Sequence, residues 1–185
     1  APRRAAPCYG PAIAMASSTR LRRAAFSLAG ALLVMACARP GLHGQTYRDR
    51  EVAFRVGPIP STWRPIDLDD TRLAFRDDEA RATVAVNGRC GKDGDDVPLT
   101  ALTAHLFLVF TDRTILSQEE LTLDGRAALR TELAAELDGV PRRFTVIVLK
   151  KDGCVYDLIL IADPRTEAGA FAAFERFAQG FATLR

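Results

Sequence analysis

Alternating apolar and polar positions predict strands in the first part of the folded body. The run 52–56 alternates apolar residues with polar or small ones and ends at Gly57-Pro58. A short strand over 73–75 and a second alternating run over 82–86 follow. A period of two puts every second side chain on one face, so each run fits a strand with one buried face. Trp63 falls in a proline-rich loop, where we expect it to cover the core.

Two segments have the spacing of amphipathic helices. The first begins at Pro98 and repeats leucine or valine at steps of three and four as far as Val109. The second follows Asp163-Pro164, a capping residue and a first-turn proline, and continues to Leu184. Its apolar stripe consists of Phe171, Phe174, Phe177, Phe181 and Leu184. Such a stripe predicts a core-facing helix rather than a cofactor site.

Four further runs predict an antiparallel meander over 121–123, 127–137, 144–149 and 154–162. The run 127–137 is rich in helix formers, but it also alternates cleanly, and Asp-Gly turns on both sides favour a strand. The last two runs are almost continuously apolar, which is typical of strands covered on both faces. We therefore predict an α+β fold in which helices cover both faces of a largely antiparallel sheet.

The first 36 residues have the layout of an export signal. Three arginines within 20–23 precede an uncharged apolar run, which ends just before Cys37. This run is too short to cross a bilayer core, which needs about 20 apolar residues. Because Met15 begins a complete signal, residues 1–14 are interpreted as an upstream disordered extension. The expected organisation is a signal peptide over 15–36, a flexible tether over 37–49 and one globular domain over 50–185.

The end of the apolar run, Leu-Val-Met-Ala-Cys at 33–37, resembles the lipobox of bacterial lipoproteins. The resemblance implies that Cys37 is lipidated and anchors the mature chain to a membrane. Met35 departs from the family, which usually has a small residue there. An ordinary secretory signal, or a buried helix with Cys37 as a bystander, is the alternative. Ala38 resembles the pattern for sorting to the outer membrane, so we expect the body to face the periplasm where the envelope has two membranes.

The charge of the chain changes when the targeting segment is set aside. Five of the 25 basic residues lie in 1–36, which leaves 20 basic residues against 23 acidic ones. No basic patch of the kind that binds nucleic acid is present in the sequence. Two acidic clusters, in 67–70 and 93–96, lack the ligand spacing of an EF-hand loop and are interpreted as solvated loops. We expect no metal and no cofactor.

Two cysteines remain in the body, Cys90 at the end of a strand and Cys154 after a hairpin. An exported compartment permits a disulfide between them, and closing such a loop adds about 4 kcal/mol in the chain-entropy model. Two buried free thiols are the alternative.

His105 and Asp157 are the candidates for catalytic chemistry. His105 lies at the edge of the predicted first helix, and Asp157 interrupts an apolar strand. A carboxylate buried there has a raised pKa. No signature places a nucleophile beside either residue, so a partly exposed histidine and a hydrogen-bonded aspartate are the simpler interpretations.

The order of elements resembles the PsbP-like α/β/α sandwich, found in photosystem-II extrinsic proteins and in bacterial lipoproteins. The resemblance covers about 50–185 and is carried by Phe54-Arg55-Val56-Gly57-Pro58 with Trp63, by Leu123-Asp124-Gly125-Arg126, and by the aromatic final helix. It implies a non-enzymatic module that binds an envelope protein or assists assembly. The alternatives are a carrier of a small apolar ligand or lipid in a phenylalanine-lined cleft between sheet and helix, and a hydrolase.

Overall fold

The computed structural model describes residues 41–91, 96–166 and 168–184. Cys37, the signal segment, the upstream extension and most of the second acidic cluster lie outside the described residues.

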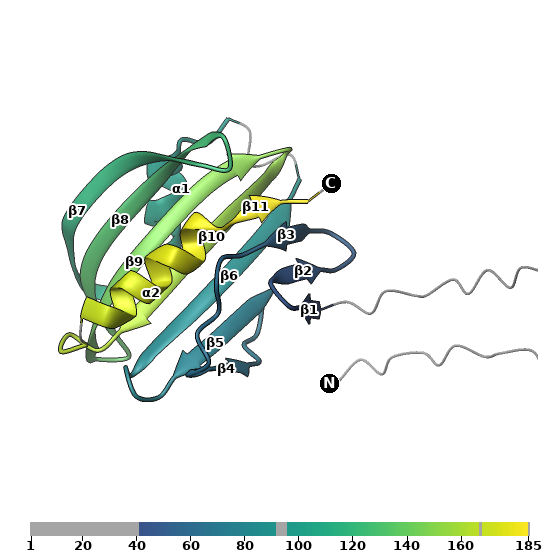
Figure 1. The fold of residues 1–185 in the computed structure, drawn as a ribbon. Coiled ribbons are helices and arrows are strands. Elements are labelled where there is room, and N and C mark those ends of the chain that lie inside the picture. Colours follow the sequence, from purple (N-terminus) through teal and green to yellow (C-terminus); the bar gives the residue numbers. More distant parts are fainter. Residues whose placement is uncertain (1–40, 92–95, 167, 185) are drawn as a thin grey trace, which may run out of the picture. The chain divides into compact units, whose positions relative to one another are not determined.

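The described strands form two antiparallel sheets (Figure 1). The larger sheet has the order β4-β5-β6-β10-β9-β8-β7, and the smaller one has the order β1-β2-β3-β11. The larger sheet contains β4 (Trp63–Ile66), β5 (Leu73–Asp77), β6 (Ala82–Cys90), β7 (Thr111–Leu123), β8 (Arg126–Leu137), β9 (Val140–Lys151) and β10 (Cys154–Ala162). The smaller sheet contains β1 (Gly41–His43), β2 (Thr46–Arg48), β3 (Ala53–Arg55) and β11 (Ala182–Thr183).

Strands β7 to β10 form the expected four-strand meander. Asp-Gly pairs make its three turns, at 124–125, 138–139 and 152–153, and both residues of each pair have positive φ. That backbone matches the twist of antiparallel hairpins, which explains why Asp-Gly recurs. The ambiguous run 127–137 is therefore a strand, as the flanking turns indicated. The meander begins at Thr111, earlier than the sequence predicted. The start of β7 was not recognised because the strand is exposed over most of its length and lacks an apolar pattern.

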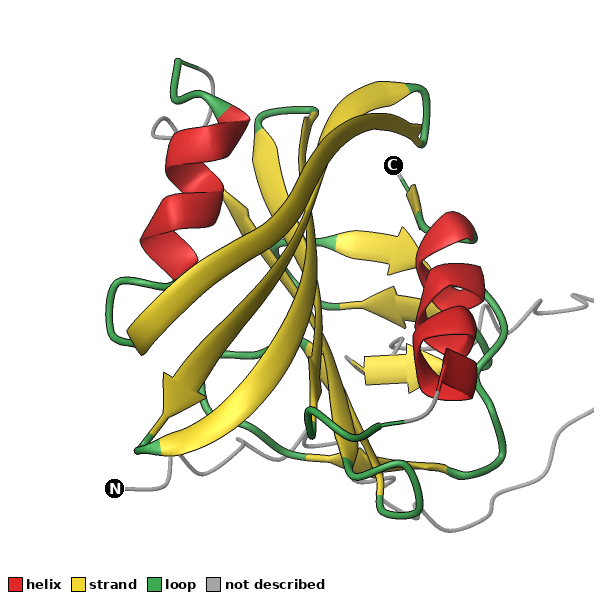
Figure 2. Ribbon diagram, turned by 90° about the vertical axis from the view of Figure 1, so that its left-hand side faces the viewer, coloured by secondary structure: helices red, strands yellow, loops and turns green. Residues whose placement is uncertain are grey.

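The two helices pack on opposite sides of the larger sheet (Figure 2). Helix α1 (Leu99–Leu106) packs on β8 and β9, with Leu102 and Phe107 among the buried side chains of that face. Helix α2 (Ala168–Gln179) packs on the other face, with Phe174 and Phe177 in the main core. The expected sandwich is only partly present, because α1 covers part of its face and the smaller sheet shares the other face with α2.

The final helix is shorter than the sequence indicated. The Asp163 carboxylate accepts hydrogen bonds from the backbone and side chain of Arg165, so it closes a local turn instead of capping the helix. The helix ends before Gly180, and the chain then pairs with β3 as β11. Phe181 is still buried, but it lies outside the helix.

The prediction of a tether over 37–49 is wrong from Gly41 onward. Strands β1 and β2 form a hairpin that pairs with β3, and the ring of Tyr47 stacks on Phe54 at 5.0 Å. These strands are too short to show an alternating pattern. Trp63 begins β4 instead of lying in a loop, but it covers the core as expected, between the rings of Phe75 and Phe177.

Asp124, in the β7–β8 turn, holds the C-terminal strand. Its Oδ2 atom accepts hydrogen bonds from the backbone and hydroxyl of Thr183, at 2.8 and 2.9 Å, and from Lys151 Nζ at 2.7 Å. Burial opposes the charge, but the hydrogen bonds from Lys151 and Thr183 outweigh it and hold the pKa of Asp124 below its ordinary value.

Gly57 and Gly180 are in backbone contact, which fixes the end of α2 against the segment after β3. The Gly57 amide donates to the carbonyl of Phe177 at 2.7 Å. A Cβ atom on Gly57 would lie 2.1 Å from the carbonyl oxygen of Arg176, and one on Gly180 would lie 2.3 Å from the Cα of Gly57. Both positions therefore require glycine for space.

We expect Gly57→Ala to lower the free energy of unfolding by about 1–3 kcal/mol, because the methyl group meets backbone atoms that cannot move independently. Urea denaturation measures the change. Gly169→Ala, in α2 and with open space around it, is the control and is expected to leave stability unchanged or slightly higher. Equal losses in the two variants would contradict this interpretation.

Candidate functional site

Asp157 lies in the middle of β10 with its side chain on the α1 side of the larger sheet. It is opposite Asn87 of β6 and Val148 of β9, and it is 0% exposed. Its neighbours on that face, two residues away along β10, are Val155 and Ile159. The expectation of a buried carboxylate in an apolar strand is therefore confirmed.

Arg89 of β6 is the partner of Asp157, which sequence reasoning did not identify. Its Nη1 atom donates to Asp157 Oδ2 in an ion pair, while 44% of the arginine side chain remains exposed. The other carboxylate oxygen, Oδ1, is buried and has no hydrogen-bond partner among the described residues. Burial raises the pKa of Asp157, and the adjacent guanidinium only partly offsets this effect.

A groove of about 690 Å³ runs between α1 and the strands β6 and β10. Its lining consists of Arg89, Cys90, Gly91, Val97, Ala101, Leu102, His105 and Val155. The structure thus brings the two predicted catalytic candidates to one region. His105 is part of the lining, and Asp157 lies below it, bonded to Arg89.

His105 and Asp157 do not form a catalytic pair in this arrangement. No hydrogen bond or ion pair joins His105 to Asp157 within the described part of the chain, and Asp157 is inaccessible. Cys90 is the cysteine of the described lining. Its sulfur is bonded to Cys154 and is therefore not a free nucleophilic thiol. The described lining therefore contains no serine, threonine or free cysteine beside His105 that could act as a covalent nucleophile.

The cleft lined by phenylalanines is not present where it was expected. Phe174 and Phe177 of α2 are both 0% exposed and fill the core between the sheets. The groove lies on the opposite face of the larger sheet, and no phenylalanine lines it.

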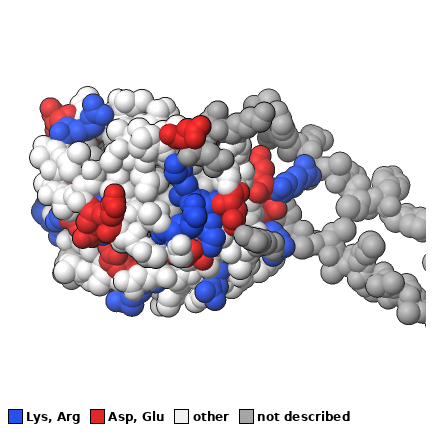
Figure 3. Space-filling model, turned by 90° about the horizontal axis from the view of Figure 1, so that it is seen from above, with Lys and Arg blue, Asp and Glu red and all other residues white. Residues whose placement is uncertain are grey.

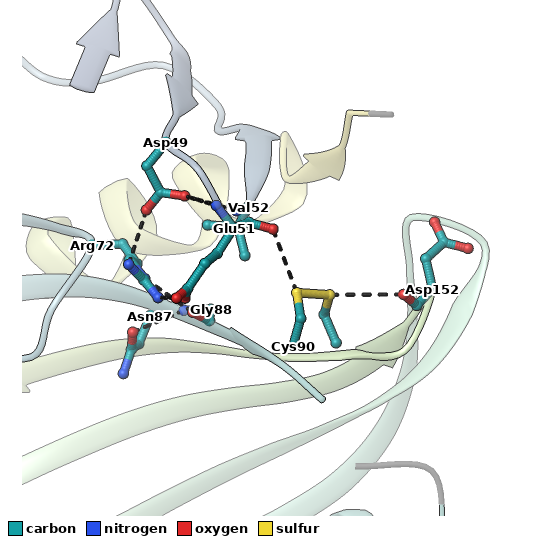
Figure 4. Close-up of a disulfide and its surroundings, with 9 residues drawn as sticks. Asp49, Glu51, Val52, Arg72, Asn87, Gly88, Cys90 and Asp152 are labelled. Carbon is teal, nitrogen blue, oxygen red and sulfur yellow. Dashed lines mark hydrogen bonds and ion pairs between the residues drawn. A yellow bond between two sulfur atoms is a disulfide. The ribbon is translucent and has the colours of Figure 1, made fainter. Parts of the chain in front are cut away.

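The predicted disulfide between Cys90 and Cys154 is present (Figure 4). The two residues are directly opposite each other in the β6–β10 ladder. Cys90 Sγ lies 3.6 Å from the carbonyl oxygen of Glu51, which brings the segment before β3 close to the bridge. The disulfide lies on the face of the larger sheet that the smaller sheet covers, and it joins the first half of the chain to the meander.

Several exposed apolar side chains come from the segment before β7, the first part of β7 and the start of β9. Five of the six large apolar residues that are most exposed in the described chain lie there: Leu108, Val109, Ile115, Leu116 and Val140. Leu108 and Val109 precede β7. Val140 is the first residue of β9, next to the residue that pairs with Glu136, and Glu136 is the partner of Thr111 at the start of β7. We call these five residues the β7-end patch.

Other kinds of site are not supported by the described residues. No group of three or more potential metal ligands lies together in the described ranges. Acidic and basic side chains are interleaved on the face seen in Figure 3. Of the helices in the described part of the chain, neither is long and apolar enough to cross a membrane.

Solved structures share this fold at low sequence identity. Cyanobacterial PsbP (CyanoP) from Synechocystis sp. PCC 6803 aligns with 82% of this chain and 99% of its own, with a TM-score of 0.56 and 16% identity. LpqN, described as involved in cell envelope biogenesis of Mycobacterium tuberculosis, aligns with 74% of this chain and 87% of its own, with a TM-score of 0.52 and 14% identity. No family model and no curated protein matches the sequence. The fold is PsbP-like, and identities this low show the fold alone.

We expect Arg89→Met to lower the free energy of unfolding by about 3–5 kcal/mol at pH 7, because it leaves a buried carboxylate without its counter-ion. Since protonation of Asp157 removes that charge, the loss is expected to shrink as the pH falls toward 4. Chemical denaturation at several pH values measures this effect.

The double variant Arg89→Met with Asp157→Leu is the control, since it removes both charges and is expected to recover most of the lost stability. If the double variant were as unstable as Arg89→Met, the unpaired carboxylate would not be the cause.

Proposed function

We propose that this protein is an exported, lipid-anchored envelope protein whose globular domain binds a protein partner without catalysis. Where the envelope has two membranes, the domain is on the outer membrane and faces the periplasm. The observation that carries the binding function is the β7-end patch.

The patch has the properties of a docking surface. Val109 is 84% exposed and Ile115 is 63% exposed. Groups of exposed apolar residues, unlike single ones, mark interaction sites on a protein surface. The patch adjoins β7, which is the last strand of the larger sheet and pairs with β8 on one side only. Register shifts at the start of β7 distort this edge, which disfavours uncontrolled pairing with other strands. A partner that covers the patch would therefore contact mainly side chains.

The location in the envelope is supported by the sequence and by the cysteines. The basic and apolar segments before Cys37 have the order of a lipoprotein signal. The Cys90–Cys154 disulfide suits an oxidising compartment. The published description of LpqN, which shares the fold, also concerns the cell envelope.

Photo-crosslinking from the patch tests the binding function. A photoreactive residue placed at Val109 or Leu116 is expected to give a discrete adduct with one envelope protein in the native host. The same residue at Leu68, an exposed leucine outside the patch, is the control and should give none. Val109→Asp should reduce the adduct formed from Leu116 at least tenfold, since it places a charge in an apolar contact. Equal labelling from Leu68 and the patch would contradict the proposal.

Replacement of Cys37 tests the anchor. Cys37→Ser removes the thiol to which a lipid would attach, so the protein should move from the membrane fraction to the soluble fraction on cell fractionation. Mass spectrometry of the unsubstituted protein should show an acylated N-terminal cysteine. Cys90→Ser with Cys154→Ser, which leaves Cys37 in place, should remain in the membrane fraction. An unmodified Cys37 thiol in the native protein would overturn this part of the proposal.

A further inference from the structure

We propose that the groove beside α1 binds a small amphiphile, an acyl chain with a carboxylate or phosphate head group, and that Arg89 holds the head group. This site is separate from the β7-end patch and adds a ligand to the protein-binding function.

The buried carboxylate of Asp157 orients the guanidinium of Arg89, as expected for an arginine that binds an anion. Asp157 is completely buried and contacts Nη1, while 44% of the Arg89 side chain is exposed. An arginine has five N–H donors in a rigid plane, so one contact with a carboxylate leaves several donors for a second anion. Fixing the guanidinium in advance lowers the entropic cost of recognising a carboxylate or phosphate.

The energetics of the pair also indicate a role beyond stability. Burying a charged pair costs several kcal/mol, and apolar side chains of similar size usually stabilise such a position at least as well. Val148 and Val155, which neighbour Asp157 in the sheet, show that apolar residues fit this face. One oxygen of Asp157 also lacks any described partner, so the carboxylate is not fully compensated by the fold. Positioning Arg89 would explain why a charged residue is buried at position 157.

The remainder of the groove suits an acyl chain. Val97, Ala101, Leu102 and Val155 provide its apolar lining. Ala101 and His105 are four residues apart and therefore lie on the same flank of α1, so a chain can follow the helix toward the imidazole. The volume of about 690 Å³ is within the range of small-molecule sites.

The described side chains that line the groove itself carry basic groups, whereas a neighbouring hollow on the other side of Arg89 contains Asp67, Asp69 and Asp70. Of the described residues that form the groove, Arg89 and His105 are basic and none is acidic. Asp157 lies beneath the lining and is inaccessible to a ligand. A neutral amphiphile would use the apolar lining but would leave the free guanidinium donors unused.

NMR titration of the oxidised full chain carrying Cys37→Ser tests this proposal. The probes are decanoate, decyl phosphate, 1-decanol and inorganic phosphate, each below its aggregation concentration. Decanoate and decyl phosphate should shift the amide signals of α1, β6 and β10 and should bind at least tenfold more tightly than 1-decanol. Inorganic phosphate distinguishes a free-anion site from an amphiphile site, and it should bind at least tenfold more weakly than decyl phosphate.

Three variants assign the binding to the groove. Ala101→Trp, at an exposed helix position, fills the groove and should weaken decanoate binding at least tenfold without loss of fold. The double variant Arg89→Met with Asp157→Leu should bind decanoate and 1-decanol equally. Arg55→Met, an exposed arginine of β3, is the matched control and should bind as the parent does.

Several results would overturn the proposal. The first two are equal affinity of the parent protein for decanoate and 1-decanol, and unchanged decanoate binding by the Ala101→Trp variant. The others are binding of inorganic phosphate as tight as that of decyl phosphate, and amide signal shifts that are confined to the β7-end patch. The last result would instead indicate that amphiphiles adsorb to the protein-binding surface.

Discussion

The junction between β6 and β10 is the constraint on which the larger sheet depends. Nine residue pairs join these strands, and they connect the strands before α1 to the meander after it. Two cross-links reinforce this junction, the Cys90–Cys154 disulfide and the Asp157–Arg89 ion pair. One is covalent, and the other is a buried charge pair that is costly to break. The groove lies directly over this reinforced part of the sheet, so its walls are among the most rigidly connected parts of the domain.

The short first helix explains why two different surfaces remain available. An eight-residue helix cannot cover the whole face of a seven-stranded sheet. Its packing on β8 and β9 leaves the groove on the β6–β10 side, and the segment after the helix carries Leu108 and Val109 into solvent. On the other face, α2 and the smaller sheet bury the phenylalanines completely. The groove and the β7-end patch therefore lie on the less covered face and at its edge.

Local chemistry made much of the fold predictable. The three Asp-Gly turns and the alternation of 127–137 determined the meander, and the two body cysteines indicated their bridge. The strands β1, β2 and β11 were missed because two or three residues are too few to show a period. The start of β7 was missed because an exposed edge strand has no buried face to produce an apolar pattern.

The candidate site was predictable only in part. Asp157 stood out because it interrupts an apolar run, and its burial followed from that run. Arg89 could have been found from the predicted disulfide. If Cys90 is opposite Cys154 in an antiparallel ladder, Arg89 is opposite Val155 and therefore close to Asp157. The β7-end patch and the groove carried no sequence signal, because the exposure of an apolar residue depends on which elements cover it in three dimensions.

The acceptor role of Asp124 has a consequence for the C-terminal end of the chain. One carboxylate oxygen accepts from Thr183 of β11 and from Lys151 of β9, so an ionised group in a distant turn adds to the β3 pairing that holds the last strand. Because the pKa of this carboxyl is lowered in the folded state, its contribution is complete above the ordinary aspartate value and disappears as acid protonates the folded form. Acidification would therefore weaken the attachment of the C-terminal strand, while the Cys90–Cys154 bridge, which does not titrate, would still hold β6 to β10.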